Sequence, residues 1–337
     1  MNKYIGIDVA KSTLQVHIPI NNKDLEVANS VTGLKQLYAK LKKQYKKELD
    51  SIVFVYEPTG SYSTMLDRFC MEHEILVFKV KPSKSSAFAK TLGHRNKSDK
   101  IDAKLLHEIG ILAKETDITI PTIDEDAHQL KSLFKYARRV MKERIALSNY
   151  LEAAIHHQED AFIIRRIRTH IKRLQAEEKA MLERMLKMIN ENQKYKQSYE
   201  NITSIKGIGS IGGLALMYLF LSYPDASRRS ITALCGLDPV SSESGISVRK
   251  KARISKQGNK AIRATFFMSS ICATIHNDEM RNFYNHLKDK GKHSTVAQVA
   301  VMRKLILLAF SLYKNNETYD SQRYLKYRQV KPENIVA

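Results

Sequence analysis

The sequence predicts an α/β region over residues 1–120, a long helical linker over residues 121–200 and a mainly α-helical region over residues 201–337. Three observations lead to this division. Short apolar runs alternate with helical patterns in the first region. Pro and Gly are absent from residues 123–200, where apolar residues recur at helical spacing. Helical patterns punctuated by Gly return from about residue 202.

The first region follows the element order of an RNase H-like fold. The expected elements are, in order, strands at 4–8, 14–18 and 25–29, a helix at 34–45, a strand at 51–56, a helix at 61–73, a strand at 75–80 and a helix at 83–92. Three antiparallel strands followed by alternating helix and strand predict this sheet. Functional residues of alternating α/β sheets gather at the carboxyl ends of the strands.

The linker region is expected to form two long antiparallel helices that pack as a coiled coil. Leu130, Leu133, Ala137 and Val140 begin the apolar repeat. Charged residues fill the other faces, including the cluster of Arg165, Arg166 and Arg168. Such a face is usually only solvated, and the alternative is a face that follows nucleic acid.

A Gly-containing turn at residues 205–209 lies between two helical patterns and is similar to a helix-hairpin-helix. Its backbone N–H groups, with Lys206 in the turn, offer a phosphate site at the start of the second helix. A tight packing turn is an equally good interpretation.

The charge balance indicates a polyanionic partner. Lys and Arg outnumber Asp and Glu by 56 to 35, which gives a formal net charge of +21. Nucleic acid is the usual partner of so basic a chain. A ribosomal-type protein or one bound to a membrane surface is the alternative.

A membrane-spanning role is not expected. Residues 1–8 lead directly into a strand pattern without the apolar segment of a signal peptide. The most apolar helical stretch, residues 296–312, contains Arg303 and Lys304 and is interpreted as a core helix. The three cysteines are far apart and form no CxxC, so we expect reduced thiols in the cytoplasm.

Four acidic residues form the first candidate site. Asp8 ends the first strand and Glu57 follows the fourth, and these strands are neighbours in an RNase H-like sheet. Asp99 and Asp102 share one helical face because they are three residues apart. Such oxygen ligands suit Mg²⁺, and two ions about 4 Å apart can stabilise both the attacking and the leaving oxygen of a phosphoryl transfer. Individually, the four could be a turn residue, a surface charge, a helix cap and an ion-pair partner.

A serine-rich segment followed by basic residues forms the second candidate site. Ser241, Ser242 and Ser244 lie in a segment framed by Gly236, Pro239 and Gly245, which predicts a loop. A serine there could attack a phosphodiester whose charge the basic residues neutralise. Residues 246–263 contain no acid and seven cations, namely Arg249, Lys250, Lys251, Arg253, Lys256, Lys260 and Arg263.

Five ordered motifs resemble the IS110-type transposases (the IS110/IS1111/IS116/IS902 group) and the related Piv-like DNA invertases. The resemblance covers nearly the whole chain. The motifs are Tyr4-Ile-Gly-Ile-Asp8-Val-Ala-Lys11, Glu57-Pro-Thr-Gly-Ser-Tyr62, Arg95-Asn-Lys-Ser-Asp99-Lys-Ile-Asp102-Ala103, Ile205-Lys-Gly-Ile-Gly209, and Gly236-Leu-Asp-Pro239 leading to Ser244-Gly245 and Ile254-Ser-Lys-Gln-Gly-Asn259.

The resemblance implies an N-terminal RuvC-like domain and a C-terminal transposase domain. Asp8, Glu57, Asp99 and Asp102 match the family's DEDD tetrad, which implies bound Mg²⁺, with Mn²⁺ as a substitute. Ser244 matches the family's nucleophile because it directly precedes Gly245, although Ser241, Ser242 and Ser247 are close by. The nucleophile would form a covalent phosphoserine during strand exchange.

The resemblance also implies the partners and the location. Family members act on double-stranded donor and target DNA and are guided by a structured RNA, called a bridge or seeker RNA. A homodimer or homotetramer in the bacterial cytoplasm, associated with the nucleoid, is expected. Nothing in the composition itself points to a guide RNA.

Three other functions fit parts of the pattern. A RuvC-like hydrolytic nuclease would use the tetrad alone, and a Piv-type invertase would act on one fixed inverted pair of sites. A non-catalytic nucleic-acid-binding protein would need neither the tetrad nor the serine.

Overall fold

The computed structural model describes residues 2–60, 62–92, 98–244 and 248–321. The chain divides into two compact units, residues 1–123 (unit 1) and residues 124–337 (unit 2). Each unit has its own hydrophobic core. They are described separately.

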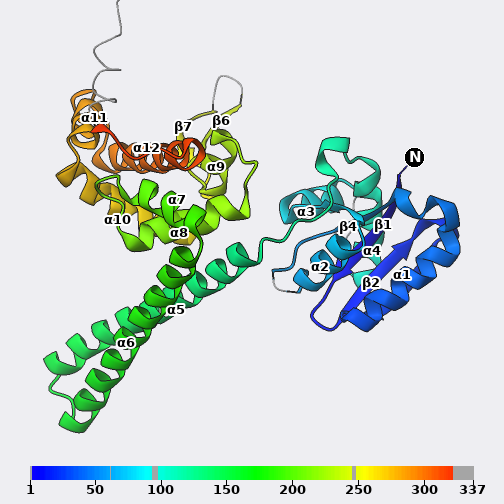
Figure 1. Ribbon diagram of the computed structural model, residues 1–337, viewed down its shortest axis with the longest axis horizontal. Helices are drawn as coiled ribbons and strands as arrows, with labels where there is room; N and C mark the ends of the chain where they lie inside the picture. The colour runs from blue at the N-terminus through cyan, green and yellow to red at the C-terminus, as the bar shows by residue number, and fades with distance from the viewer. Residues whose placement is uncertain (1, 61, 93–97, 245–247, 322–337) are drawn as a thin grey trace, which may run out of the picture. The chain divides into compact units, whose positions relative to one another are not determined.

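Unit 1 is built on a five-stranded mixed sheet with the order β3-β2-β1-β4-β5 (Figure 1). β1 pairs antiparallel with β2, which pairs antiparallel with β3, whereas β1–β4 and β4–β5 are parallel. The predicted mixed α/β character of this region is confirmed. The strands are β1 (Lys3–Val9), β2 (Thr13–Ile18), β3 (Lys23–Ala28), β4 (Ile52–Tyr56) and β5 (Leu76–Lys79).

The third strand begins two residues earlier than its apolar pattern indicates. A short 3₁₀ turn, Pro19–Asn21, ends at Asn22 in the left-handed conformation (φ 45°). This tight connection lets Ile18 pair directly with Lys23. The turn therefore sets the register of the β2–β3 hairpin.

Helices cover both faces of the sheet. α1 (Val31–Tyr45) and α2 (Thr64–Glu72) pack on the face that carries Ile5, Ile7 and Phe54. α4 (Asp99–Ile111) packs on the other face with Val53 and Val55. β4 is buried on both faces, which explains why its sequence is continuously apolar. The remaining helices are α3 (Pro82–Thr91) and the 3₁₀ segments Lys46–Ser51 and Glu115–Asp117.

Unit 2 is mainly helical, and two long helices project from it as a hairpin (Figure 1). These are α5 (Glu125–His156) and α6 (Ala161–Glu191), which lie where two long helices are expected. Asp124 and Asp160 cap their N-termini through hydrogen bonds from Ala127 N and Phe162 N, at 2.9 and 2.7 Å. An ion pair of 2.7 Å between Arg144 and Glu178 joins the two helices. Coiled-coil packing remains a prediction.

The other helices of unit 2 enclose one hydrophobic core. α12 is long and apolar enough to cross a membrane by length and composition. Val301, Leu305 and Ile306 of α12 are nevertheless buried in the core of unit 2, so it packs as a core helix. The helices are α7 (Gln193–Thr203), α8 (Ser210–Ser222), α9 (Arg228–Leu234), α10 (Lys260–His276), α11 (Asp278–Asp289) and α12 (Ser294–Asn315).

The segment expected to be a loop around Ser244 is instead a two-stranded antiparallel ribbon. β6 (Pro239–Ser244) pairs with β7 (Val248–Ile254), with an irregularity between Val240 and Ser242. The loop prediction was wrong because it relied on Pro and Ser as loop formers. Proline is compatible with the first residue of a strand, where Pro239 stands, and Val248 and Ile254 favour β structure.

Candidate active site

The sheet register brings Asp8 and Glu57 to the same edge. Ile7 pairs with Tyr56 in the parallel β1–β4 ladder, so the next residues along the two strands are Asp8 and Glu57. Both side chains are half-buried. This position at the carboxyl ends of two neighbouring parallel strands is where α/β sheets place functional residues.

Helix α4 lies directly on β1 because Gly6 has no side chain. A Cβ on Gly6 would lie 1.9 Å from the Ala103 carbonyl oxygen and 2.6 Å from the His107 nitrogen. Further along the helix, Gly110 approaches Tyr4 in the same way, where a Cβ would lie 3.0 Å from Tyr4 Cβ. Residues 103, 107 and 110 thus meet β1 in reverse order, so α4 runs antiparallel to β1.

This direction brings the first turn of α4 toward the end of β1 that carries Asp8. Asp99 and Asp102 both lie in that turn. The positive end of the helix dipole stabilises carboxylates there. Ser98 caps the helix, since its Oγ accepts a hydrogen bond from Ile101 N at 3.4 Å. The fold therefore brings all four predicted acids toward one end of the sheet. Arg95, Asn96 and Lys97 of the same motif lie outside the described residues.

A serine on α3 holds Glu57. Ser85 is 9% exposed, and its Oγ donates a 2.6 Å hydrogen bond to Glu57 Oε2. Thr59 Oγ1 donates to Val9 O at 3.1 Å and ties the segment after β4 to the end of β1. The sequence contains no signal for the Ser85 contact, because serine is common at the start of helices.

A polar network surrounds the hydroxyl of Tyr56, the residue before Glu57. The Tyr56 hydroxyl donates to Asp67 on α2, and Lys79 Nζ lies 2.7 Å from the same carboxylate oxygen. Burial, followed by the charge of Asp67, raises the pKa of Tyr56, so the hydroxyl stays protonated as a donor. Sequence reasoning missed this network.

The four acids suit a divalent metal by donor type. Mg²⁺ prefers hard oxygen ligands and keeps several waters, so it needs only one or two carboxylates at a time. Within the described parts of the chain, no group of three or more His, Cys, Asp or Glu side chains surrounds a point where a metal could bind. The residues fit the ion in donor chemistry, with Asp8 and Glu57 at the carboxyl ends of β1 and β4 and Asp99 and Asp102 in the first turn of α4.

The predicted nucleophile Ser244 is the last residue of β6, where it pairs with Val248. Ser241 and Ser242 belong to the same strand, whereas Gly245 and Ser247 lie outside the described residues. The ribbon belongs to unit 2.

Side chains at the base of the ribbon join its two strands to each other and to helix α10. Asp238 Oδ1 accepts a 2.5 Å hydrogen bond from Ser255 Oγ. Arg263 Nη1 donates to Cys235 O and Gly258 O at 3.1 and 2.8 Å. These contacts fix where the ribbon leaves the helical core.

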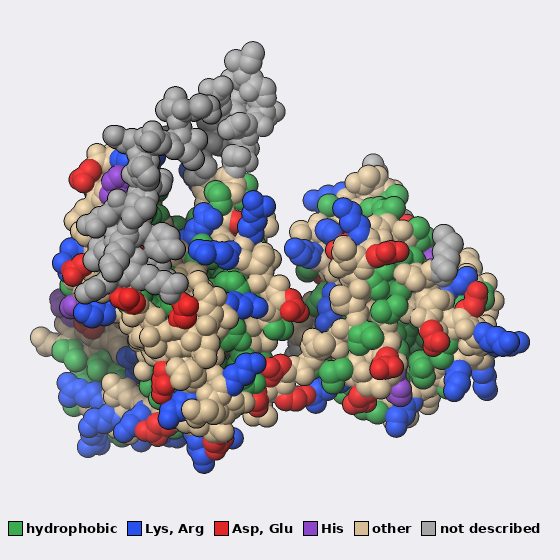
Figure 2. Space-filling model, turned by 45° about the horizontal axis from the view of Figure 1, so that its top comes forward, with side chains coloured by type: hydrophobic (Ala, Val, Ile, Leu, Met, Phe, Trp, Pro, Cys, Tyr) green, Lys and Arg blue, Asp and Glu red, His purple; other side chains and the backbone are tan. Residues whose placement is uncertain are grey.

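The predicted nucleic-acid-binding residues lie on α6, in the turn at residues 205–209, and on or just after β7, all in unit 2. Three arginines are exposed on α6, namely Arg165, Arg166 and Arg168. Lys206 is exposed in the turn at residues 205–209. Arg249, Lys250, Lys251 and Arg253 belong to β7, and Lys256 follows it. Figure 2 shows Lys and Arg side chains over the visible surfaces of both units.

The turn at residues 205–209 has a packing explanation. Gly207 has a φ of +110°, and a Cβ there would lie 2.5 Å from Ala273 Cβ. Asn277 Nδ2 donates to Lys206 O at 3.4 Å. A glycine is thus required by backbone conformation and close packing, whether or not the turn also contacts phosphate.

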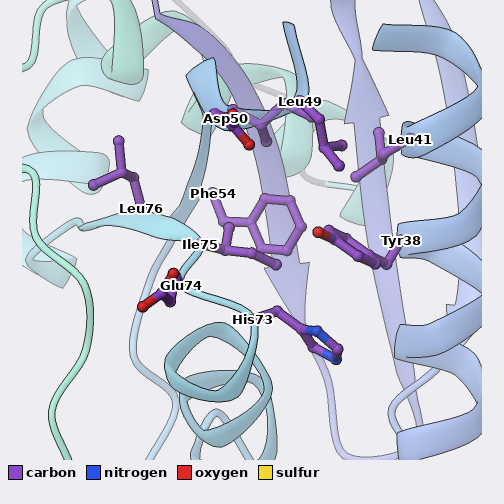
Figure 3. A pocket seen from close by; sticks show the side chains of 10 residues that line it. Tyr38, Leu41, Leu49, Asp50, Phe54, His73, Glu74, Ile75 and Leu76 are labelled. Carbon is purple, nitrogen blue, oxygen red and sulfur yellow. The ribbon is translucent and has the colours of Figure 1, made fainter. Parts of the chain in front are cut away.

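A small cavity at the opposite end of the unit 1 sheet lies away from the acids. It has a volume of about 30 Å³, and Figure 3 shows Tyr38, Phe54 and His73 among the side chains that line it. The Tyr38 and His73 rings stack with centroids 5.0 Å apart. This volume suits one water molecule and is too small for a nucleotide.

Two transposase family models match the chain in succession. One, described as "Transposase" of the DEDD IS110 type, matches residues 5–157, and the other, "Transposase IS116/IS110/IS902 family", matches residues 199–285. The first covers the four acids and the second covers the ribbon with Ser244.

Curated relatives agree with the family models. The chain is 26% identical to the pilin gene-inverting proteins of Moraxella bovis and Moraxella lacunata, over 95% of this chain and 98% of each relative. It is 23% identical to the "Insertion element IS110 uncharacterized 43.6 kDa protein" of Streptomyces coelicolor, over 36% of this chain and 30% of that protein. Because both models match in order along one chain, the chain belongs to the IS110 (IS116/IS110/IS902) family of transposases.

Proposed function

We propose that this chain is the RNA-guided transposase of an insertion sequence, which cuts and rejoins DNA through a covalent phosphoserine. The observation that carries the proposal is the succession, in one chain, of the acid-bearing and serine-bearing transposase regions. A hydrolytic nuclease would need only the first. Unit 1 is proposed to be RNase H-like, of the RuvC-like type, which the strand order β3-β2-β1-β4-β5 supports.

Asp8, Glu57, Asp99 and Asp102 are proposed to hold Mg²⁺, or Mn²⁺ in its place. The bound ion supplies Lewis-acid stabilisation of the charge that develops on the phosphate oxygens. Among the protein's own groups, Ser85 orients Glu57, and the first turn of α4 stabilises the charges of Asp99 and Asp102.

Ser244 is proposed to attack the scissile phosphorus through its Oγ. The new Oγ–P bond replaces the bond to the 3′-oxygen, and as Oγ loses its proton the 3′-oxygen gains one and leaves as a 3′-hydroxyl strand end. The energy of the phosphodiester is kept in the phosphoserine, so the strand can be rejoined to another end without a further energy source. Water as nucleophile would lose that energy.

The proposed partners are double-stranded donor and target DNA, a structured bridge or seeker RNA and further copies of the chain, as a homodimer or homotetramer. A formal net charge of +21 supports nucleic-acid partners. The exposed Arg165, Arg166, Arg168, Lys206, Arg253 and Lys256, with Arg249, Lys250 and Lys251 of β7, are proposed to contact phosphates. A DNA-rearranging enzyme with these partners would work in the bacterial cytoplasm, at the nucleoid.

The test is to isolate the full chain with the RNA that co-purifies, sequence that RNA, and incubate the complex with cognate DNA and Mg²⁺. A protein–DNA adduct that resists denaturation is expected from the wild type. Ser244→Ala should abolish the adduct and strand joining, because it removes the oxygen proposed to attack the phosphorus. Asp8→Asn should also abolish the adduct, through loss of a metal ligand.

Ser241→Ala and Ser242→Ala are the matched controls, since both residues lie on the same strand as Ser244. Either control should keep the adduct. Hydrolytic nicking that persists undiminished in Ser244→Ala, with no adduct in the wild type, would instead establish a RuvC-like nuclease. Unchanged activity in Asp8→Asn would contradict the metal role.

A Piv-type invertase is the second candidate, because the pilin gene-inverting proteins align along 98% of their length. The same chemistry would then act on one inverted pair of sites. A plasmid carrying the native flanks in inverted orientation distinguishes the two. Inversion without a joined donor–target product supports the invertase, and insertion into a separate target supports the transposase.

A further inference from the structure

The α5–α6 hairpin carries a hollow between its two helices. Its volume is about 290 Å³, far above the 30 Å³ of the cavity in unit 1. One lining residue comes from α5 and five come from α6. They are Leu147, Arg166, Ile167, Thr169, His170 and Arg173, which we call the hairpin groove.

The groove uses one face of α6 and leaves other cations on the opposite face. Arg166, His170 and Arg173 recur at intervals of four and three residues, so they lie on one side of the helix. Arg165 and Arg168 do not line the groove. The Arg165 guanidinium instead lies 5.9 Å from the centre of the Phe162 ring. The arginine cluster of the sequence is therefore divided in the structure, with Arg166 in the groove and Arg165 and Arg168 outside it.

The positive charges of the first half of α6 have no acidic residues beside them in the sequence. Residues 161–176 contain five Lys and Arg and no acid. The later part of α6 differs, since Lys179 and Lys187 each pair with a glutamate four residues on, at 3.8 Å. A merely solvated helical face is expected to look like the later part.

The lining combines three kinds of contact that an unpaired nucleotide needs. Arg166 and Arg173 offer guanidinium groups to a phosphate or to the face of a base, and His170 offers a ring that can stack. Ile167, which is 8% exposed, and the half-buried Leu147 supply an apolar floor.

We propose that the hairpin groove binds one unpaired nucleotide of a nucleic-acid strand, with its base on the apolar floor and its phosphate at the arginines. A duplex keeps its bases stacked inside and would present only its backbone to this helix. The apolar floor formed by Ile167 and Leu147 would then have no base to contact. The ligand is thus an unpaired segment of RNA or of melted DNA, which share this chemistry. The inference rests on the proposed function only in that the chain handles nucleic acid.

The test measures binding of the full-length protein to fluorescent oligonucleotides of one sequence, as single-stranded RNA, single-stranded DNA and duplex DNA. Arg166→Gln with Arg173→Gln should weaken binding to the preferred single strand on the order of tenfold to a hundredfold. Duplex binding should fall only about threefold, through the loss of charge. The single strand that loses more identifies RNA or DNA as the source.

Arg165→Gln with Arg168→Gln is the matched control, because it removes the same charge from the same helix outside the groove. It should weaken all three probes equally, by about threefold. Thr169→Met keeps the charge and fills the groove from an exposed position, and it should weaken single-strand binding selectively.

If both double variants lose the same binding affinity, or if duplex and single strands lose affinity equally, the proposal that the hairpin groove binds a nucleotide is wrong. The arginines would then form only a general basic surface. Unchanged binding in Thr169→Met would also contradict the proposal. Failure here is separable from failure of the proposed chemistry, because the adduct at Ser244 is measured independently.

Discussion

The acidic edge of unit 1 and the β6–β7 ribbon of unit 2 hold their candidate catalytic residues in different ways. Asp8 lies near the end of β1 and Glu57 directly follows β4, in a sheet that helices cover on both faces. Ser244 ends a ribbon of only two strands, attached by the contacts of Asp238 and Arg263. An isolated two-stranded ribbon is marginally stable in water.

This difference matches the proposed chemistry. Metal ligands must keep their spacing within a fraction of an ångström, and a fully packed sheet provides that rigidity. A nucleophile that exchanges DNA strands benefits from an element attached only at its base. The acidic edge should therefore respond to changes in packing, whereas the ribbon should respond to changes at its base.

The largest effect is expected from Gly6→Val. The added side chain meets the backbone of α4, so unit 1 should lose about 3 kcal/mol of stability. Thermal unfolding measures the loss, and the Ser244 adduct should disappear with it. Gly209→Ala is the control, because a Cβ there meets nothing within 4 Å. An unchanged melting temperature for Gly6→Val would contradict the close packing of α4 on β1 at this position.

Removing the base of the ribbon should have the next largest effect. Arg263→Met leaves the carbonyls of Cys235 and Gly258 without their donor, which should cost about 2 kcal/mol. Unit 2 should melt earlier, and the adduct yield should fall more than DNA binding does. The exposed Arg229→Met in α9 is the charge-matched control. Full adduct yield in Arg263→Met would mean that the ribbon does not depend on this attachment.

A smaller effect is expected from Ser85→Ala. The variant loses the 2.6 Å hydrogen bond that orients Glu57, a loss of about 1 kcal/mol. The Mg²⁺ concentration that gives half-maximal adduct formation should rise about fivefold, because a free Glu57 binds metal less well. Ser83→Ala on the same helix, at an exposed position, should leave the Mg²⁺ dependence unchanged. A rise in both variants would indicate a general disturbance of α3.

The smallest effect concerns pH. Burial lowers the pKa of His107, although its Nδ1–H donates to Tyr4 O at 2.8 Å. The unfolded chain therefore binds the proton more tightly, so unit 1 should be most stable above the ordinary value of 6.5 and lose stability as the pH falls below it. Thermal unfolding of His107→Gln across this range should show a weaker decline. An equal decline would assign the pH dependence to other groups.

Much of unit 1 could be predicted because its local patterns are unambiguous. The continuous apolar run of β4 predicts a buried strand. The spacing of Leu34, Leu37 and Leu41 predicts a helix. The contacts of Ser85 and Asp67 could not be predicted, since they join residues 28 and 11 positions from their partners, Glu57 and Tyr56, and depend on how helices dock. The ribbon was missed because strand pairing is decided by a partner strand, which composition does not reveal.

The sequence by itself determined the order of the elements in unit 1 and the positions of the four acids at their ends, because periodicity and chain order are local properties. Only the tertiary structure decided that α4 runs antiparallel to β1 over Gly6, and that Arg166 lines a groove from which Arg165 is absent. The reason is physical. Which faces meet depends on side-chain volumes and close backbone approaches between distant segments, and no local pattern records them.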